Sequence, residues 1–127
     1  MIWRWLRSET AEAVHPEQLA EHGGGAGVRD RGLLLSALAR PENLAAYGEP
    51  DAAALAAAYA FGVAKNHPFI DGNKRTAWVL ARLFLSKNGV SMNCKEVEAV
   101  VVMLRLAAGE LSEDELADWF RERITPA

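Results

Sequence analysis

Two helical segments enclose a short polar run in the middle of the chain, and this pairing constrains the fold more than any other feature. The segment Asp51–Lys65 is alanine-rich, and Lys74–Asn88 carries apolar residues at helical spacing. Pro68 disfavours a helical conformation for His67, so the first helix must end there. The pair Asn88–Gly89 is typical of a helix C-terminus. The sequence therefore predicts two helices joined by a tight loop, with apolar faces of Leu55, Tyr59, Gly62 and Val63 on the first and Ala77, Leu80, Ala81 and Phe84 on the second.

Residues that cap helix N-termini mark two further helices in the last third of the chain. Asn93 followed by Glu96, and Ser112 followed by Glu115, both resemble capping boxes. Each pair opens a segment with apolar residues at helical spacing, so we expect two helices packed on the core. The expected stripes are Val97, Val100, Val101 and Leu104 on the first helix and Leu116, Trp119 and Phe120 on the second.

The first third of the chain also has helical patterns, and each contains or meets a proline. Asp30 is a suitable cap for the pattern Arg31–Leu38, and Pro41 is the expected stop. The segment Thr10–Glu21 is compatible with another helix, in which Pro16 lies near the start or bends it.

Signals for β-strands are almost absent. The one candidate is the tryptophan-containing start, with Trp3 and Trp5, which could pair with Val90–Met92. No repeat or long linker divides the chain. We therefore expect an all-α fold, a compact helical bundle in which residues 1–127 form one domain with at most one short N-terminal strand.

The charge and the spread of apolar residues exclude several classes of function. A formal net charge of −3 argues against nucleic acid as the main ligand. No apolar run approaches the length of a membrane span, and the N-terminus lacks the apolar core of an export signal. The single cysteine, Cys94, has no disulfide partner and no Cys or His at metal-ligand spacing. We therefore expect a soluble, cytoplasmic protein that binds neither nucleic acid nor membrane directly.

The polar run from residue 67 to residue 75 predicts a phosphate seat. If the second central helix begins near Lys74, the N–H groups in its first turn have no helical partner and lie where the helix dipole is positive. Lys74 and Arg75 add cations where a helix prefers acidic residues, which costs stability unless an anion joins them. The expected seat consists of Gly72, Asn73, Lys74 and Arg75.

Other residues of the run have roles that the sequence leaves open. Asp71 caps the second helix or holds a Mg²⁺ ion that bridges phosphate oxygens. Asn73 caps locally or donates to a phosphate. A histidine beside a phosphate seat, His67, suggests transfer to a hydroxyl group. Phe69 is expected to anchor the loop in the core.

These residues resemble the Fic/Doc family, and more closely its Doc branch, the death-on-curing toxins of bacterial toxin–antitoxin pairs. The family pattern is His, any residue, Phe, any residue, an acidic residue, Gly or Ala, Asn, Gly or Lys, then Arg, and every place is filled here. Stretches around residues 21–41, 58–62 and 107–111 are also similar to that branch. The resemblance implies that His67 is the general base acting on a protein hydroxyl and that Asp71 positions Mg²⁺, while the phosphates of ATP or another nucleoside triphosphate are held by Gly72, Asn73, Lys74 and Arg75.

Two positions of the run favour the Doc branch. Lys74 stands where AMP-transferring Fic enzymes usually have Gly, and Trp78 stands where they have a second Arg. The resemblance then implies a protein kinase that transfers the terminal phosphate to a translation factor, elongation factor Tu, and so arrests translation and growth. Gly72 is the Fic-like choice and leaves AMP transfer as an alternative.

The resemblance also implies a protein inhibitor. Self-inhibited Fic proteins carry Ser or Thr, three residues, Glu, then Gly or Asn, and the nearest match here, Ser8 with Glu12, is followed by Ala13. A toxin without this brake needs a Phd-like antitoxin whose C-terminal segment folds into a groove. Trp3 and Trp5 could line such a groove, although core packing or ordinary strand pairing is the favoured role for either ring. A second hypothesis is a catalytically weak module whose main work is antitoxin binding.

Three other features receive simpler interpretations. Gly23–Gly27 lacks the Lys-Ser or Lys-Thr pair of a phosphate loop and is expected to be a flexible turn. His15 and His22 are not at a metal-ligand spacing. Arg29 could shape an antitoxin surface, whereas its neighbour Asp30 is explained as a helix cap.

Overall fold

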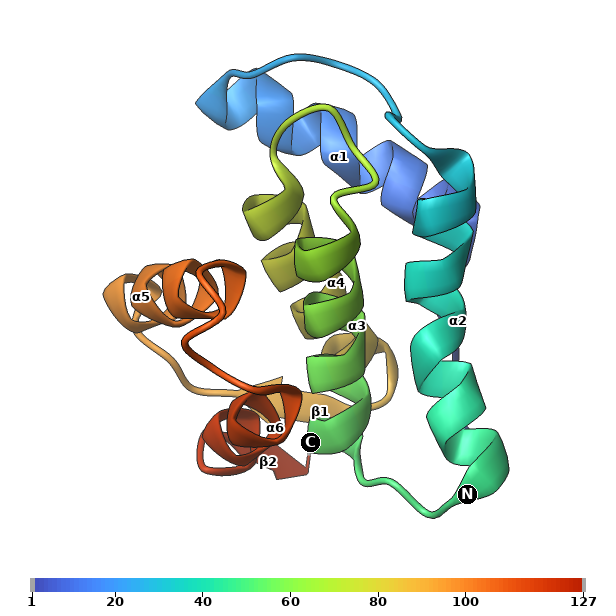
Figure 1. Cartoon of the computed structure of the whole chain (residues 1–127). Coiled ribbons are helices and arrows are strands. Elements are labelled where there is room, and N and C mark those ends of the chain that lie inside the picture. Colours follow the sequence, from blue (N-terminus) through green and yellow to red (C-terminus); the bar gives the residue numbers. More distant parts are fainter. Residues whose placement is uncertain (1, 127) are drawn as a thin grey trace.

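The computed structural model describes residues 2–126 as a bundle of helices with one very small sheet (Figure 1). The predicted all-α class is confirmed, since the two strands contain three residues each. The elements in chain order are α1 (Ser8–His22), α2 (Arg31–Tyr47), α3 (Ala52–Asn66), α4 (Asn73–Lys87), β1 (Val90–Met92), α5 (Glu96–Ala107), α6 (Glu113–Arg121) and β2 (Ile124–Pro126).

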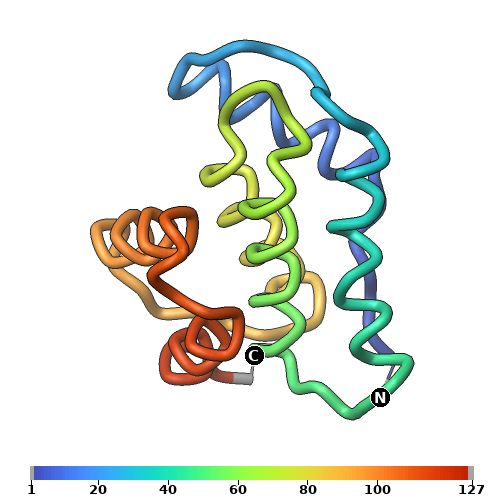
Figure 2. The backbone as a smooth tube through the Cα atoms, in the orientation of Figure 1, coloured from blue at the N-terminus to red at the C-terminus, as the bar shows by residue number. Residues whose placement is uncertain are grey.

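Helix α3 forms the centre of the bundle, with α2 and α4 on either side of it (Figure 2). Its alanines allow close approach of the neighbouring helices, and a Cβ atom at Gly62 would lie 3.1 Å from the Ala37 carbonyl oxygen of α2. Asp51 caps α3 by accepting a hydrogen bond from the Ala54 N–H at 2.9 Å. Both predicted apolar faces, on α3 and on α4, are buried as expected. The loop between these helices lies at the end of the bundle opposite both ends of the chain (Figure 1).

The predicted strand pairing is half wrong. Val90–Met92 is a strand, but its antiparallel partner is the C-terminal segment Ile124–Pro126 and not the N-terminus. Residues 2–7 have no regular secondary structure, and side chains from elsewhere in the chain bind their backbone. The Arg4 N–H donates to Asn88 Oδ1 at 2.8 Å, and the Asn88 amide donates back to the Arg4 carbonyl at 3.0 Å.

The two N-terminal tryptophans pack against the core. The ring centroids of Trp3 and Trp5 each lie 5.9 Å from that of Phe84, which is completely buried on α4. Both rings also line a hollow of about 1020 Å³ at the end of the bundle that carries the chain ends. The core-packing interpretation of the tryptophans is confirmed, and the hollow beside them lies far along the bundle from the α3–α4 loop.

Two helices continue through prolines. Pro41 does not stop α2, which runs to Tyr47, and Pro16 lies inside α1. Proline removes one helical hydrogen bond, and at Pro41 the carbonyl that loses its donor is that of Ala37, which faces Gly62 of α3. Pro41 itself is buried. Packing against α3 therefore outweighs the local cost of the proline.

One of the two predicted capping boxes is present. Ser112 accepts from the Glu115 N–H at 3.1 Å, and the Glu115 carboxylate accepts from the Ser112 N–H at 3.0 Å. The box predicted at Asn93 is wrong, because α5 begins at Glu96 with no side-chain cap. The Asn93 N–H instead donates to the Arg123 carbonyl at 2.9 Å and extends the pairing beyond the small sheet.

Helix α5 buries the face opposite to the predicted one. The stripe of Val97, Val100, Val101 and Leu104, hereafter the α5 stripe, is 50–75% exposed. Both sides of this helix are apolar, so helical periodicity could not choose between them. The residues that pack inward are Ala99, Val102, Met103 and Leu106.

Within residues 2–126, no helix is long and apolar enough to cross a bilayer.

Candidate active site

The polar run forms the loop between α3 and α4, and its two ends have unusual backbone angles. His67 closes α3 with φ 48° and ψ 54°, the left-handed conformation, and Gly72 precedes α4 with φ 74°. His67 is the one residue other than glycine with a positive φ among the described residues. Such a conformation costs about 1–3 kcal/mol for a residue with a side chain. Pro68 contributes to it by disfavouring the right-handed helical conformation at His67.

Phe69 and Asn73 hold the loop from the inside. The Phe69 ring is buried, as predicted. The Asn73 side chain, which is 8% exposed, accepts from the Phe69 N–H and donates to the Phe69 carbonyl, both at 3.0 Å. Of the roles that the sequence left open, this amide neither caps α4 nor faces solvent in this conformation. Its two hydrogen bonds fix the loop, and the backbone N–H of Asn73 precedes the α4 ladder.

The segment between α1 and α2 holds the loop from the outside. The Arg29 and Asp30 N–H groups both donate to the Pro68 carbonyl, at 2.7 and 3.0 Å, and the Ile70 N–H donates to the Gly27 carbonyl at 3.1 Å. These bonds place Val28 opposite Phe69 as an antiparallel bridge. The loop is therefore paired along its length with a segment some 40 residues earlier in the chain.

Arg29 has a second role, which the sequence did not indicate. Its guanidinium donates to the carbonyls of His67 at 2.7 Å and Asn66 at 2.9 Å. These carbonyls lie at the C-terminal end of α3, where the helix dipole is negative and carbonyls lack helical donors. Arg29 therefore holds the backbone of His67 in its left-handed conformation.

The glycine-rich segment is packed against the loop and is not a free turn. A Cβ atom at Gly24 would lie 2.8 Å from Asp71 Oδ2, and one at Gly25 would lie 3.0 Å from the Ile70 side chain. A side chain at residue 24 would therefore require the Asp71 carboxylate to shift, and the positive φ of Gly24 also favours glycine there. The expectation of a flexible turn at Gly23–Gly27 did not account for this contact.

The ionisable side chains of the polar run face the solvent. His67, Asp71, Lys74 and Arg75 are exposed, and Gly72 is half-buried. Lys74 and Arg75 form no ion pair within the part of the chain that the structure describes. The first helical hydrogen bond of α4 runs from the Thr76 N–H to the Gly72 carbonyl at 3.0 Å, so the N–H groups of residues 73–75 precede the ladder. The N-terminus of α4 thus combines a positive dipole with two unpaired cations.

Asp71 and Gly72 differ in part from the sequence interpretation. Asp71 does not cap α4, because the residue before the helix is Gly72 and no side chain caps it. The Asp71 carboxylate instead accepts the Gly72 N–H at 2.8 Å through Oδ1. The Gly72 N–H is therefore engaged in this conformation, and the free N–H groups are those that follow it.

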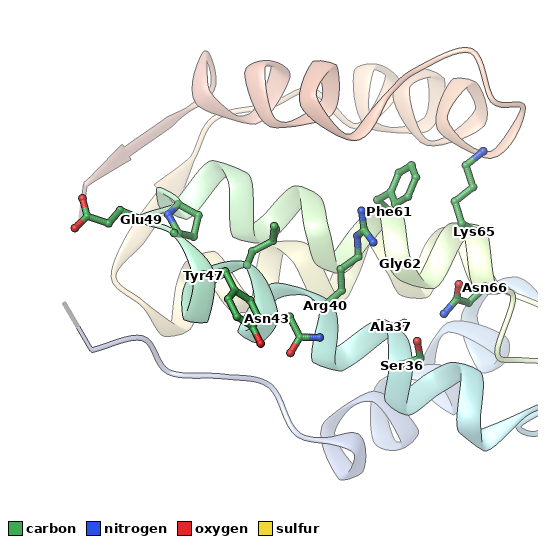
Figure 3. Close-up of a pocket in the computed structure, with 13 residues that line it drawn as sticks. Ser36, Ala37, Arg40, Asn43, Tyr47, Glu49, Phe61, Gly62, Lys65 and Asn66 are labelled. Carbon is green, nitrogen blue, oxygen red and sulfur yellow. The ribbon is translucent and has the colours of Figure 1, made fainter.

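A hollow beside the loop connects these cations to the α5 stripe. It has a volume of about 410 Å³ and lies between α1, α4 and α5. Its lining includes Lys74, Arg75 and Trp78 from α4, and Val100 and Leu104 from α5. A larger hollow of about 720 Å³ lies between α2 and α3, where Arg40, Tyr47 and Lys65 border it (Figure 3). That hollow ends at Asn66 and includes no residue of the polar run.

Comparison with known proteins decides the family. Residues 5–85, which include α1 to α3 and most of α4, match the Fic/DOC family model. The chain belongs to the Fic/DOC family. Its relatives within the family include "Protein kinase doc" of Escherichia phage P1, 34% identical over 119 residues that make up 93% of this chain and 94% of that protein. "Toxin Doc" of Mycolicibacterium smegmatis is 48% identical over 73 residues, 55% of each chain.

The Fic/DOC match covers the loop and every element that holds it. Arg29 and His15, which contact the loop backbone, lie within the matched residues, whereas the α5 stripe lies beyond them. The family model therefore covers the scaffold of the site, and the match to the P1 phage relative, over 93% of this chain, extends beyond it.

Proposed function

We propose that this protein is the toxin of a type II toxin–antitoxin system and a protein kinase. It transfers the terminal phosphate of ATP or another nucleoside triphosphate to a hydroxyl of a translation factor, elongation factor Tu by resemblance, and so arrests translation and growth. The observation that carries the proposal is the exposed N-terminus of α4, where Lys74 and Arg75 have no anionic partner among the described residues and lie one loop away from His67. The names of the two Doc relatives support it.

In this proposal each outward group has one part in the transfer. His67 takes the proton of the acceptor hydroxyl while that oxygen bonds to the terminal phosphorus and the bond to the bridging oxygen breaks, which releases the nucleoside diphosphate. Lys74, Arg75 and the free N–H groups of residues 73–75 bind the phosphate oxygens. Gly72 has no side chain, so phosphates can approach the backbone there.

Asp71 is the residue that fits Mg²⁺. Its carboxylate is exposed beside the seat, and one oxygen is oriented by the Gly72 N–H. The described residues contain no cluster of three His, Cys, Asp or Glu groups that would form a protein-only metal site. A single carboxylate suits Mg²⁺, which commonly binds through one or two carboxylates together with substrate phosphates and water. When bound there, the ion would neutralise charge on the phosphates.

Trp78 supports transfer of the terminal phosphate over transfer of AMP. The position at which AMP-transferring relatives carry a second Arg here holds an aromatic ring, packed 5.9 Å from Trp119 and 6.1 Å from Phe120. This position offers no cation to the nucleotide, whereas Lys74 places one at the start of the helix. AMP transfer remains the alternative, since Gly72 is the Fic-like residue.

Labelled nucleotides test the reaction. With Mg²⁺ and a nucleoside triphosphate labelled at the terminal phosphate, the protein is expected to label one dominant protein of a bacterial lysate. The same nucleotide labelled at the α-phosphate is expected to leave that protein unlabelled, and the mass of the purified acceptor should rise by one phosphate group. Transfer of the α-label alone would show AMP transfer in its place.

The α5 stripe is the surface that we assign to the antitoxin. It is apolar and exposed, and it borders the hollow that contains Lys74 and Arg75. An amphipathic antitoxin helix would cover the apolar side chains, and an acidic residue on it would meet the two cations. Glu12, the nearest match to a built-in inhibitory glutamate, pairs with Arg31. The inhibitor is therefore expected to be a separate, Phd-like protein whose C-terminal segment folds on binding.

Charges placed on the α5 stripe test this assignment. The double variant Val97→Glu, Val101→Glu is expected to weaken antitoxin binding by about 100-fold, because it places two carboxylates in an apolar interface. Neither residue lines the hollow with Lys74, so phosphoryl transfer should be unchanged. The matched control is Leu35→Glu on α2, where the native side chain is 46% exposed and away from α5. Equal antitoxin affinity of the double variant and the control, measured by calorimetry, would exclude the stripe.

A further inference from the structure

His15 is a buried histidine on α1 that contacts the polar loop from behind. The residue is only 3% exposed. Its ring stacks on the Phe69 ring, with centroids 4.0 Å apart and planes 9° from parallel. Its Nε2 atom lies 2.7 Å from the Asp71 carbonyl oxygen. One side chain from outside the loop thus contacts both the residue that anchors the loop and the residue that faces the seat.

The chemistry of this contact determines which atom carries the proton. A carbonyl oxygen can only accept, so His15 Nε2 is the donor and bears a hydrogen. The donated bond fixes the carbonyl of the peptide between Asp71 and Gly72. The N–H of the same peptide donates to Asp71 Oδ1 at 2.8 Å. Because the peptide is planar, a bond that orients its carbonyl also orients its N–H.

The Asp71 carboxylate is consequently oriented through Oδ1, which accepts the Gly72 N–H. Oδ2 lies close to Gly24, where a Cβ atom would be 2.8 Å from it. On the α1 side, His15 and Leu19 border Gly72, and their nearest atoms would lie 3.5–3.8 Å from a Cβ atom at that position. Rotation of the Asp71–Gly72 peptide would therefore break two hydrogen bonds at once: the one from His15 to the carbonyl and the one from the Gly72 N–H to Asp71 Oδ1.

We propose that His15 is a positioning residue for Asp71, and that it sets the affinity of the site for a divalent cation bound with nucleotide. The inference rests on the proposed function, in which Asp71 holds Mg²⁺. His15 does not touch the substrate. It acts through the Asp71–Gly72 peptide, whose orientation decides where the carboxylate points.

Two substitutions separate the hydrogen bond from the packing. His15→Phe keeps an aromatic ring to stack on Phe69 but has no donor. His15→Gln loses the ring but can place an amide N–H near the position of Nε2. If the bond positions Asp71, His15→Phe should weaken the binding of Mn²⁺ with a non-hydrolysable nucleotide by about 5–10-fold, and His15→Gln should restore most of that affinity.

The measurements are Mn²⁺ binding by electron paramagnetic resonance and amide exchange of Gly72 by nuclear magnetic resonance. In His15→Phe the Gly72 N–H is expected to exchange about tenfold faster than in the native protein, with the thermal transition close to the native one. The Mg²⁺ concentration for half-maximal transfer should rise in parallel with the loss of Mn²⁺ affinity, and the rate at saturating Mg²⁺ should change less.

The outcomes distinguish this inference from the proposed function. If His15→Phe leaves Gly72 exchange and Mn²⁺ affinity unchanged, or if His15→Gln is weaker in both than His15→Phe, His15 only packs and the inference is overturned. If the native protein transfers no phosphate while His15→Phe still alters Gly72 exchange and Mn²⁺ affinity, the kinase proposal fails and the positioning of Asp71 by His15 stands.

Discussion

Replacement of His67 by alanine is expected to lower the rate of phosphoryl transfer by about 10²–10⁴-fold, the range usual for loss of a general base. The His67 side chain is exposed and makes no hydrogen bond within the described residues, so its removal should leave the fold intact. The bond that holds this position uses the His67 carbonyl, which alanine retains. The rate of terminal-phosphate transfer to the purified acceptor and the thermal transition together measure this effect.

His67→Gly provides a matched control that separates catalysis from backbone strain. Glycine adopts the left-handed conformation of residue 67 without a side-chain penalty, so this variant is expected to be about 1 kcal/mol more stable than His67→Ala and equally inactive. Denaturant unfolding of the two variants gives the comparison. Full growth inhibition by His67→Ala in cells would show that catalysis is not the source of toxicity, and the antitoxin-binding module would then become the better description.

Asn73→Ala is expected to lower the free energy of unfolding by about 2–4 kcal/mol, because it leaves two buried backbone groups of Phe69 without partners. A domain of this size is usually stable by only about 5–15 kcal/mol, so the loss is a large fraction of the total. Transfer activity should fall with it, since the same two bonds hold the loop that carries His67 and the start of α4. Chemical denaturation and the transfer assay below the unfolding transition measure the two effects.

Asn73→Asp is the control for this second prediction. Its carboxylate can still accept the Phe69 N–H but cannot donate to the Phe69 carbonyl, so its stability should lie between those of the native protein and Asn73→Ala. Native stability combined with lost activity in Asn73→Ala would mean that the amide binds the nucleotide directly and reorients to do so. That outcome would contradict the structural role of Asn73.

Local sequence determined most of the secondary structure and the location of the site. The two central helices, the break at His67–Pro68 and the capping box at Ser112 depend on neighbouring residues, through proline geometry, cap hydrogen bonds and apolar periodicity. The family pattern at residues 67–75 located the candidate site, and the match over residues 5–85 confirmed the family.

Errors of the sequence interpretation occur where contacts between distant residues outweigh local preference. Pro41 remains inside α2 because packing on α3 compensates for one lost hydrogen bond. The strand at residues 90–92 pairs with the C-terminal segment, whereas the N-terminal segment is held at Arg4 by the Asn88 side chain. Helix α5 has two apolar faces, and only its packing against the bundle decides which one is buried.

The site shows the same division. Sequence alone identified the residues that face outward, because they are the ionisable residues of a short local run. These residues are His67, Asp71, Lys74 and Arg75. Phe69 was expected to anchor the run, but only the tertiary structure revealed the residues outside the run that hold it in place. Arg29 lies 38 residues before the His67 carbonyl that it binds, His15 lies 56 residues before the Asp71 carbonyl, and Gly24 lies about 47 residues before the carboxylate beside it. Such contacts follow from how α1 and the segment after it pack across the loop, which no local pattern encodes.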